Sequence, residues 1–364
     1  MISFTINGHV VEAAPGMTVL TAARQAGITI PTLCAHPDLT PYGGCQLCMV
    51  EVKGEPKLAQ SCTKEVRAGM EVRTETLKVR DARRTILELL LSLYYDNHPS
   101  ASDAEDNELI HWARHYGLSI RKGMASGPRY PVDSDPNPFI RVDLNKCIMC
   151  TRCVRACAEI QGRFVWGIQG RGIDAHIAAG NGEDMLDARC ESCGACVAYC
   201  PTGALSNRMS FGLDGSRQVS RATTICGYCG VGCTLDLLVK NEKVIGVASN
   251  PKGAVNGMAL CVKGRYGYDY IHHPERLSRP KVRRYLLEGG AKDRTGPAWD
   301  WVDTDWDTAL QLTADRLRST RDTTGPDSIG ILSSAKCTNE ENYLMNKLAR
   351  QVIGTHNLDH CARL

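Results

Sequence analysis

The chain has 364 residues, with 43 lysine and arginine residues against 40 aspartate and glutamate residues and a formal net charge of +3. This length allows two or three domains, each with its own core. The balanced charge, without long blocks of one sign, argues against nucleic-acid binding and against an acidic or basic tail.

The sequence also lacks the usual features of an exported or membrane protein. Its longest apolar run, residues 86–95, contains Glu88 and is too short to span a bilayer. The first residues form neither a secretion signal nor a twin-arginine leader. A cytoplasmic location is therefore expected, and in that reducing compartment 18 bunched cysteines indicate metal binding or catalysis rather than disulfides.

Residues 1–78 are predicted to form a first domain of strands and one helix. Strands are expected at residues 2–8, 9–16, 48–54 and 70–76, with a helix at 18–27. Its loops carry four cysteines: Cys34, Cys45, Cys48 and Cys62.

These four thiolates suit a 2Fe–2S cluster, which needs two on each iron. The spacing differs from the plant type, which places four residues between its first two ligands, and a Rieske centre would need a second Cys-x2-His. The spacing and flanks resemble the N-terminal ferredoxin domain of the large iron–sulfur subunit of complex I and its relatives. That resemblance implies a β-grasp fold.

Residues 79–138 are expected to be a helical connector. A helix with an apolar stripe of Val79, Ile86, Leu87, Leu90 and Leu93 should end near residues 97–99, "NHP". A proline-rich stretch at 128–138 then marks a domain boundary.

After "NHP", the complex I family commonly carries a 4Fe–4S cluster held by one histidine and three cysteines. This chain has Ser102 and Glu105 where thiolates should stand, and these are poor substitutes for soft ligands. The cluster is therefore expected to be lost, with His98, His111 and His115 as ordinary surface or capping residues.

Residues 139–215 contain two cysteine runs of identical spacing, Cys-x2-Cys-x2-Cys-x3-Cys. In this bacterial pattern three thiolates hold one cubane, and the fourth crosses to the neighbouring cluster. A zinc ribbon would use two separated pairs instead. The pattern predicts one 4Fe–4S cluster on Cys147, Cys150, Cys153 and Cys200, and a second on Cys190, Cys193, Cys196 and Cys157.

A fourth cysteine group lies in residues 219–275, on Cys226, Cys229, Cys233 and Cys261. This spacing, with "VKGR" after the last cysteine, resembles the 4Fe–4S domain that opens molybdenum and tungsten enzymes with two pyranopterin guanine dinucleotides. The resemblance implies a third 4Fe–4S cluster here. It also implies that Lys263 lies between this cluster and the nearer pterin, where its charge assists electron passage; a solvated surface charge is the alternative.

Residues 276–364 have the pattern of the beginning of an α/β domain. A helix is expected at 306–320, a buried strand at 328–334 and a second helix at 338–354. Thr338 and Glu341 form a capping box, and Gly354 is a plausible C-cap. The apolar stripe of the second helix is Leu344, Leu348 and Val352.

A strand that leads into a helix N-terminus is where pyrophosphates bind in such folds. Residues 333–339 are thus candidates to contact a guanine dinucleotide, a plain strand–loop–helix being the alternative. The candidate contacts are Ser333, Lys336, Cys337 and Asn339. Cys337 and Cys361 match no cluster pattern, and Cys337 is expected as a small buried residue rather than a metal ligand.

Residues 337–364 closely resemble the catalytic subunit of molybdenum- or tungsten-dependent formate dehydrogenases, and the order of modules resembles the cytoplasmic, multi-subunit kind. The fold class expected is multidomain, α+β and then α/β. The resemblance implies oxidation of formate to carbon dioxide at a metal held by two dithiolenes. Electrons would pass Lys263, three 4Fe–4S clusters and the 2Fe–2S cluster, to a flavin-bearing NAD-reducing subunit or a hydrogenase subunit.

Two other functions remain open. One is a non-catalytic electron-transfer subunit related to the complex I subunit, and the other is a different pterin enzyme such as a nitrate reductase. An iron-only hydrogenase shares the first three modules, but the fourth cysteine group and the α/β pattern replace its active-site domain.

The C-terminal residues raise a further expectation. In the formate dehydrogenases that this chain resembles, the metal ligand would be the residue after Leu364, a cysteine or selenocysteine followed by a histidine. The sequence is therefore expected to be the front part of a longer selenoprotein, cut where an in-frame UGA codon was read as stop. The alternatives are a deliberately chosen chain end, a frameshift and a fragment of a cysteine enzyme. The DNA sequence after codon 364 distinguishes them.

Overall fold

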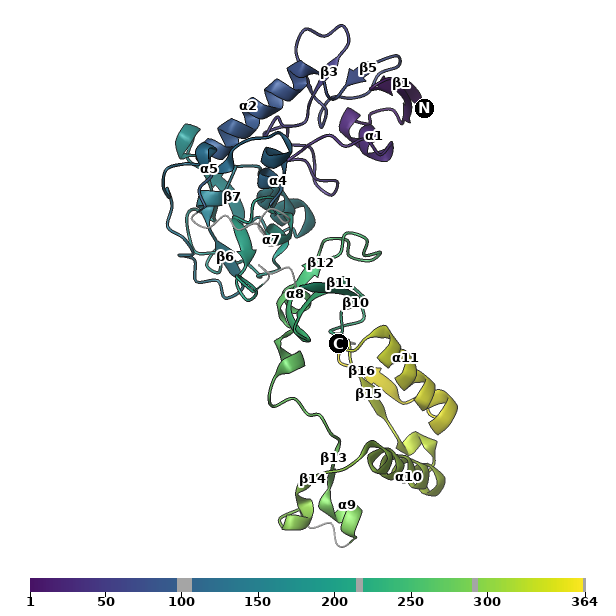
Figure 1. Cartoon of the computed structure of the whole chain (residues 1–364). Helices are drawn as coiled ribbons and strands as arrows, with labels where there is room; N and C mark the ends of the chain where they lie inside the picture. Colours follow the sequence, from purple (N-terminus) through teal and green to yellow (C-terminus); the bar gives the residue numbers. More distant parts are fainter. Residues whose placement is uncertain (97–106, 214–218, 290–293, 363–364) are drawn as a thin grey trace.

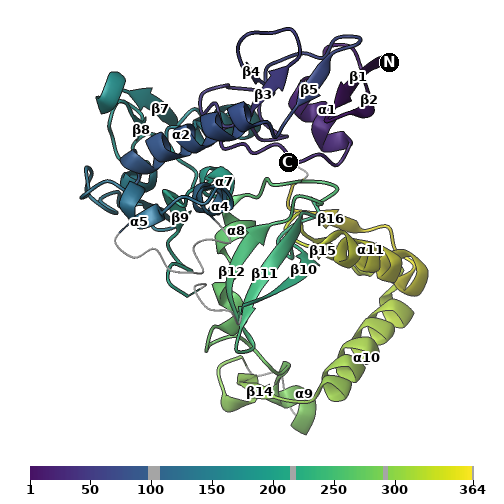
Figure 2. The same cartoon turned by 45° about the horizontal axis from the view of Figure 1, so that its top comes forward.

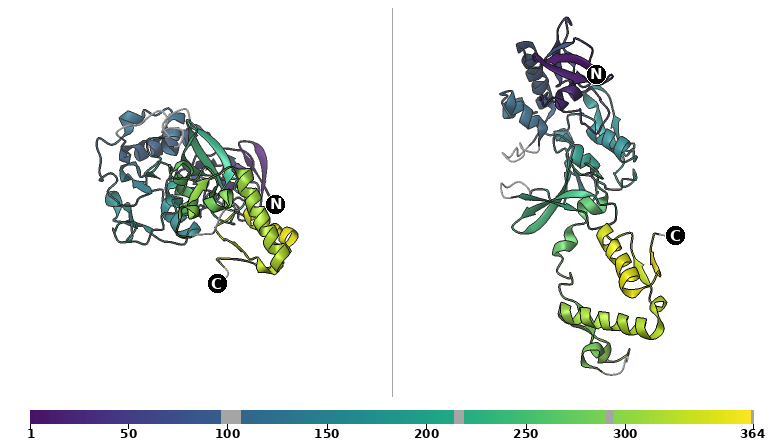
Figure 3. Two further views of the ribbon diagram at one scale, coloured as in Figure 1. Left: turned by 90° about the horizontal axis from the view of Figure 1, so that it is seen from below. Right: turned by 90° about the vertical axis from the view of Figure 1, so that its right-hand side faces the viewer.

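The computed structural model describes residues 1–96, 107–213, 219–289 and 294–362. The modules follow one another along the molecule, from the N-terminal sheet at the top of Figure 1 to the helices α9 and α10 at the bottom. The side view in Figure 3 shows the same succession. Among the described residues, no helix has both the length and the apolar character needed to cross a membrane.

The first module is a five-stranded sheet in the order β2-β1-β5-β3-β4. β1 pairs antiparallel with β2 through an Asn7-Gly8 turn, where both residues have positive φ, and parallel with β5. Thr18 caps α1, which packs on the sheet. The bounds are β1 Ile2–Ile6, β2 His9–Ala13, α1 Val19–Gln25, β3 Met49–Val52, β4 Ala59–Gln60 and β5 Glu71–Arg73.

The connector contains α2 (Leu77–Leu93), α4 (Glu108–His115) and α5 (Ile120–Gly123). The predicted stripe of α2 was partly wrong, because the buried side chains are Val79, Arg83, Leu87 and Leu91, one turn apart, while Leu93 is exposed. Hydrogen bonds to Glu75, the Tyr116 hydroxyl and the Met49 carbonyl let Arg83 occupy this apolar face. His111 and His115 are exposed, as predicted, whereas His98, Ser102 and Glu105 lie outside the described residues.

The third module has an internal repeat. β6 (Ile140–Val142) pairs with β9 (Leu205–Asn207), and β7 (Trp166–Gln169) pairs with β8 (His176–Ala179). A short helix lies within each cysteine run and contains its third cysteine: α6 (Arg152–Arg155), which continues as a π-helical turn, and α7 (Ala195–Tyr199). Cysteine side chains of both runs belong to the apolar core of this module.

The fourth module is an antiparallel sheet of β10 (Ser220–Ile225), β11 (Thr234–Lys240) and β12 (Lys243–Ser249). It is followed by α8 (Val262–Tyr266), whose Tyr266 packs into the core of the third module. In Figure 2 this sheet lies between the third module and the C-terminal part of the chain.

The last module contains β13 (Lys281–Arg283), α9 (Arg284–Glu288), β14 (Trp301–Asp303), α10 (Trp306–Thr324), β15 (Ile331–Ser333), α11 (Asn339–Lys347) and β16 (Leu358–His360). β13 pairs with β14, and β15 pairs in parallel with β16. The capping box is confirmed, and Gly354 ends the helical segment in a left-handed conformation.

The predicted burial of this module was wrong in part. Leu332 of β15 is 88% exposed, and Leu344 and Val352 of the second helical segment are 57% and 59% exposed. No described element packs over these side chains. An apolar stripe shows which face of a helix or strand can be buried, but it does not show that a packing partner is present.

Candidate functional site

The four cysteines of the first module lie together under the β-grasp sheet. Cys34, Cys45, Cys48 and Cys62 are all buried. Their thiols approach as two pairs: contact with Cys45 lowers the pKa of Cys34 to about 5, and contact with Cys62 lowers the pKa of Cys48 to about 7. The backbone N–H of Cys34 also donates to the Cys45 Sγ at 3.4 Å. Two close thiol pairs are an arrangement that suits a 2Fe–2S cluster.

The eight cysteines of the third module line two separate cavities. The lining of one includes Cys147, Cys150, Cys153 and Cys200. The lining of the other includes Cys157, Cys190, Cys193 and Cys196. Each cavity thus takes three cysteines from one run and one from the other, the grouping that the crossed 4Fe–4S pattern requires.

The thiols around these cavities surround a space rather than one point. Within the described ranges, no three His, Cys, Asp or Glu side chains converge on a position for a single metal ion. Burial raises the pKa of Cys147 and Cys150 to about 12, so these thiols need a cationic partner to ionise. A multi-iron cluster fits both observations.

The two cysteine loops share an unusual backbone. Met149 and Thr151 have φ of 54° and 58°, and the equivalent Ser192 and Gly194 have φ of 52° and 70°. Backbone N–H groups donate to Cys147 Sγ at 3.4 Å and to Cys190 Sγ at 3.3 Å, from Met149 and Ser192. Left-handed non-glycine residues are costly and tend to mark functional loops. The sequence signals this conformation only at Gly194.

The fourth cysteine group is formed by a loop and a helix start. Cys226 and Cys233 bracket the β10–β11 connection, and the N–H of Cys226 donates to the Cys233 carbonyl at 2.8 Å. Cys261 is the N-cap of α8. Neighbouring thiols, among them Cys229 and Cys261, add to burial in raising the pKa of Cys226 and Cys233. The structure therefore brings the four sulfurs of this group together.

Lys263 projects from α8 beside this cysteine group. Within the same helix Arg265 and Tyr266 are buried against the third module, while Lys263 is exposed. Its proposed place between a cluster and a second cofactor stays a prediction. The geometry provides an exposed cation two residues after Cys261.

The predicted dinucleotide contacts divide into two groups. Cys337 and Asn339 lie against the fourth cysteine loop, since a Cβ on Gly230 would lie 2.9 Å from Asn339 Oδ1 and 3.8 Å from the Cys337 carbonyl. Ser333 instead lines a pocket of ≈ 440 Å³ at the carboxyl ends of β15 and β16. Lys336 is exposed, and Cys337 is half-buried rather than buried.

This pocket also contains residues that the sequence reasoning missed. Asn342 Nδ2 donates to the Ser334 carbonyl, and Asn342 Oδ1 accepts from Ser333 Oγ. Asn346, Asp359 and His360 complete the polar lining. The parallel strand that ends at His360 could have been found as the return strand of a βαβ unit.

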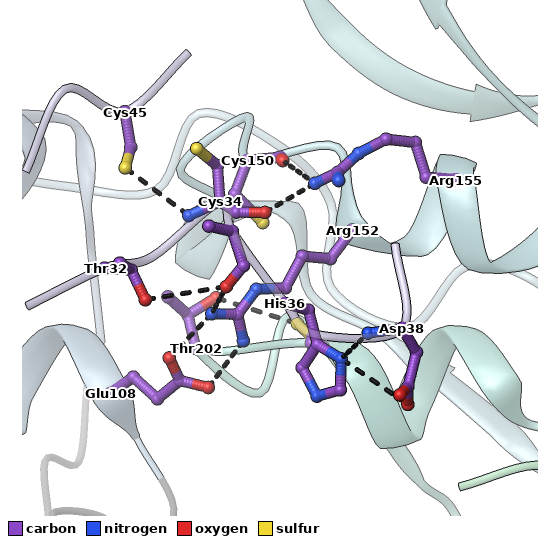
Figure 4. Close-up of polar contacts among 12 residues, drawn as sticks. Thr32, Cys34, His36, Asp38, Cys45, Glu108, Cys150, Arg152, Arg155 and Thr202 are labelled. Carbon is purple, nitrogen blue, oxygen red and sulfur yellow. Dashed lines mark hydrogen bonds and ion pairs between the residues drawn. The ribbon is translucent and has the colours of Figure 1, made fainter. Parts of the chain in front are cut away.

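Arginines of α6 join the first and third modules. Arg152 donates to Glu108 at 2.5 Å and to the Ala35 carbonyl at 3.0 Å. Arg155 donates to the carbonyls of Cys34 at 2.6 Å and of Cys150 at 3.3 Å. Figure 4 shows both guanidinium groups reaching the loop that carries Cys34. The first two candidate clusters are therefore neighbours in the fold.

Four family models match the chain in succession. They are a 2Fe–2S iron–sulfur cluster binding domain at residues 1–77, the ferredoxin-like domain of NADH-quinone oxidoreductase subunit 3 at 137–206, a molybdopterin oxidoreductase Fe4S4 domain at 220–273 and molybdopterin oxidoreductase at 276–364. The unmatched connector separates the first two.

Similar proteins cover the whole chain. The alpha subunit of an NADPH-Fe(3+) oxidoreductase of Geobacter sulfurreducens is 34% identical over 100% of this chain and 40% of its own length. A Staphylococcus aureus protein named "Putative formate dehydrogenase" is 28% identical over 99% of this chain and 39% of its own length. The chain thus spans about two fifths of these relatives.

Solved structures also match the chain, and one of them covers just over half of it. A chain from the crystal structure of an NAD+-reducing [NiFe]-hydrogenase is 30% identical, with a TM-score of 0.50, over 57% of this chain and 87% of that chain. Together the matches show a multidomain protein with 2Fe–2S, ferredoxin-like 4Fe–4S and molybdopterin domains. The chain thus carries 2Fe–2S and ferredoxin-like domains ahead of two segments that match the domains of molybdopterin oxidoreductases.

Proposed function

We propose that these residues are the front portion of the catalytic subunit of a cytoplasmic, molybdenum- or tungsten-dependent formate dehydrogenase. The observation that carries the proposal is the placement of four cysteine sets between the β-grasp domain and the α/β module: one set in the first module, two in the third and one in the fourth. The S. aureus relative supports formate as the substrate by its name. The activity is proposed for the longer protein, because the relatives extend well beyond the matched region.

The bound clusters would supply one-electron carriers, and a bis-pyranopterin metal centre would supply the two-electron chemistry. The chain's own groups bind and orient these cofactors. The proposed domain limits are 1–78, 79–138, 139–215, 219–275 and 276–364. The sixteen cysteines in complete sets are the proposed ligands, and Lys263 and the segment from Ser333 to Asn339 are proposed to face the pterin.

The partner is proposed to be a flavin-bearing NAD-reducing subunit, with a hydrogenase subunit as the alternative. The likeness to a chain of an NAD+-reducing hydrogenase supports a multi-subunit assembly. Co-purification of the full-length protein identifies the partner. A full-length protein that reduces NAD without another subunit would contradict this part of the proposal.

The main test is made on the full-length protein purified without oxygen. Metal analysis should find molybdenum or tungsten, and formate should bleach the iron–sulfur absorbance without another reductant. The matched controls are acetate and NADPH. Iron–sulfur clusters that are reduced by dithionite but not by formate would overturn the proposal.

A second candidate function is suggested by the Geobacter relative, which is named as an alpha subunit of an NADPH-Fe(3+) oxidoreductase and is 34% identical. In that case the chain would relay electrons that a partner draws from NADPH. Reduction by NADPH with the partner present, together with absence of molybdenum and tungsten, would favour this function.

A further inference from the structure

Two buried arginines lie at the two junctions between the modules that carry candidate cluster sites. Arg155 joins the first and third modules, and Arg265 joins the third and fourth. Both are almost completely buried, with 9% and 3% exposure. A buried guanidinium loses its hydration, so each needs partners that compensate its charge.

Three of the four hydrogen-bond partners of Arg155 are backbone carbonyls, two of them of candidate ligands, and the fourth is Thr151 Oγ1. Its Nη2 donates to the carbonyls of Cys34 at 2.6 Å and Cys150 at 3.3 Å, and its Nη1 donates to the Thr40 carbonyl at 2.5 Å. Cys34 belongs to the 2Fe–2S set, and Cys150 belongs to the first 4Fe–4S set. One guanidinium therefore binds the backbone of both.

Arg265 repeats this arrangement at the next junction. Its Nε donates to the Cys193 carbonyl at 2.9 Å, and its Nη2 donates to Ser249 Oγ at 3.0 Å. Gly194 is required beside it, because a Cβ there would lie 2.3 Å from Arg265 Cδ. Unlike Arg155, Arg265 binds the carbonyl of only one candidate ligand, Cys193, which belongs to the second 4Fe–4S set.

Among the described residues, neither arginine has a carboxylate as counter-charge. In the described part of the chain, Arg152 forms an ion pair with Glu108, whereas no Asp or Glu lies within ion-pair distance of Arg155 or Arg265. Neutral carbonyls compensate a full positive charge only in part. Clusters held by four thiolates would carry net negative charge, and both guanidinium groups bind the backbone of residues that are candidate ligands.

We propose that Arg155 and Arg265 are positioning residues that serve as counter-charges for the adjacent clusters and fix the spacing between modules. Arg155 acts on the 2Fe–2S cluster and the first 4Fe–4S cluster, and Arg265 acts on the second 4Fe–4S cluster. When one electron crosses a junction, one cluster is oxidised and the neighbouring cluster is reduced, and no covalent bond forms or breaks. The inference rests on the proposed cluster content and does not depend on formate.

The test is a redox titration of the 2Fe–2S cluster, followed by electron spin resonance in the full-length protein with dithionite as the reductant. Cluster potentials depend on net charge, hydrogen bonding and exposure. Arg155→Gln removes the charge and should make reduction harder, shifting the equilibrium with a one-electron mediator about tenfold, or about 59 mV. Arg155→Lys keeps the charge and should shift it less than threefold.

Two further variants give matched controls. Arg171→Gln removes an exposed charge from the same module, and Arg265→Gln removes the other buried charge. Both should leave the 2Fe–2S potential unchanged, while Arg265→Gln lowers the potential of a 4Fe–4S cluster. Iron content and spin counts verify assembly of each variant.

An unchanged 2Fe–2S potential in Arg155→Gln would overturn the proposal, and so would an equal shift in Arg171→Gln. If Arg155→Gln fails to assemble, Arg155→Lys decides, because a tenfold shift with the charge retained contradicts the counter-charge role. Wild-type protein without iron would instead refute the proposed cluster content, and a loss of formate oxidation alone would leave this inference unaffected.

Discussion

Arg83 shows how a single polar side chain can hold two modules together. It is fully buried in α2, and its guanidinium donates to Glu75 at 2.7 Å, to the Tyr116 hydroxyl at 2.8 Å and to the Met49 carbonyl at 2.7 Å. These partners come from the segment between β5 and α2, from the C-cap of α4 and from β3. The arginine therefore fixes the connector against the β-grasp domain.

Replacing Arg83 by Ala is expected to lower stability substantially. The substitution leaves a cavity and removes three hydrogen bonds, and effects of this kind typically amount to about 2–4 kcal/mol. Thermal unfolding of the chain should show a lower midpoint for the first transition. Lys53→Ala, which breaks an exposed ion pair with Glu71, is the control and should change stability by less than about 0.5 kcal/mol. Equal midpoints for the two variants would contradict the role of Arg83.

Lys263 offers a second prediction, on electron transfer. Lys263→Ala should leave all clusters assembled, since the cysteine loop is unchanged, and should slow cluster reduction by formate about tenfold, which corresponds to roughly 1.4 kcal/mol of barrier. Stopped-flow absorbance of the full-length protein measures the rate. Lys252→Ala, at another exposed lysine of the same module, should be neutral. If the clusters of the Lys263→Ala variant are reduced by formate at the wild-type rate, Lys263 is a surface charge without a role in electron transfer.

Helix α11 begins with a capping box, a local interaction that stabilises its N-terminus although the helix is not buried. None of its residues is buried, yet its N-terminus has a complete capping box: the N–H of Glu341 donates to Thr338 Oγ1 at 3.3 Å, and the N–H of Thr338 donates to Glu341 Oε2 at 2.7 Å. The cap satisfies backbone donors that a helix otherwise leaves unpaired.

Thr338→Ala is expected to fray the first turn of α11. Loss of an N-cap costs about 1 kcal/mol, so the amides of this turn should exchange roughly fivefold faster. Hydrogen exchange of peptides from residues 336–347 measures the effect. Thr338→Ser keeps the hydroxyl and should exchange like the wild type, and so should peptides from α10. Equal exchange in Ala and Ser variants would mean that the cap contributes nothing.

For the full chain, the sharpest prediction comes from the two cavities of the third module, each lined by three cysteines of one run and one of the other. The ligand sets require about fourteen iron atoms, from one 2Fe–2S and three 4Fe–4S clusters. Cys200→Ala, in the second cysteine run, should lose the cluster of the first cavity and leave about ten iron atoms. Cys361→Ala, at an exposed thiol outside all sets, should retain all iron.

Iron analysis with low-temperature spin resonance distinguishes the outcomes. Loss of the cluster associated with Cys190, Cys193 and Cys196 in the Cys200→Ala variant would contradict the crossed assignment. A total near eighteen iron atoms in the wild type would mean that the connector keeps a histidine-ligated cluster.

Cysteine spacing was a stronger guide than apolar patterning in this chain. The grouping around the two cavities follows from spacing alone, because each run fixes three sulfurs on one loop. The burial of Arg83 was not predictable, since it depends on partners such as Met49, which lies 34 residues away in the sequence. The same holds for Arg155, whose partner Cys34 lies 121 residues away.

Because each cavity of the third module takes cysteines from both runs, the two cavities also limit where recombination can divide this protein. A crossover between Cys157 and Cys190 would separate the contributors to both cavities at once, so two foreign halves would have to match each other in two places. A crossover in the proline-rich stretch at 128–138 or just before β10 divides neither cavity. The third module is therefore inherited as an indivisible block, whereas sites whose ligands come from one loop can be gained or dropped one at a time.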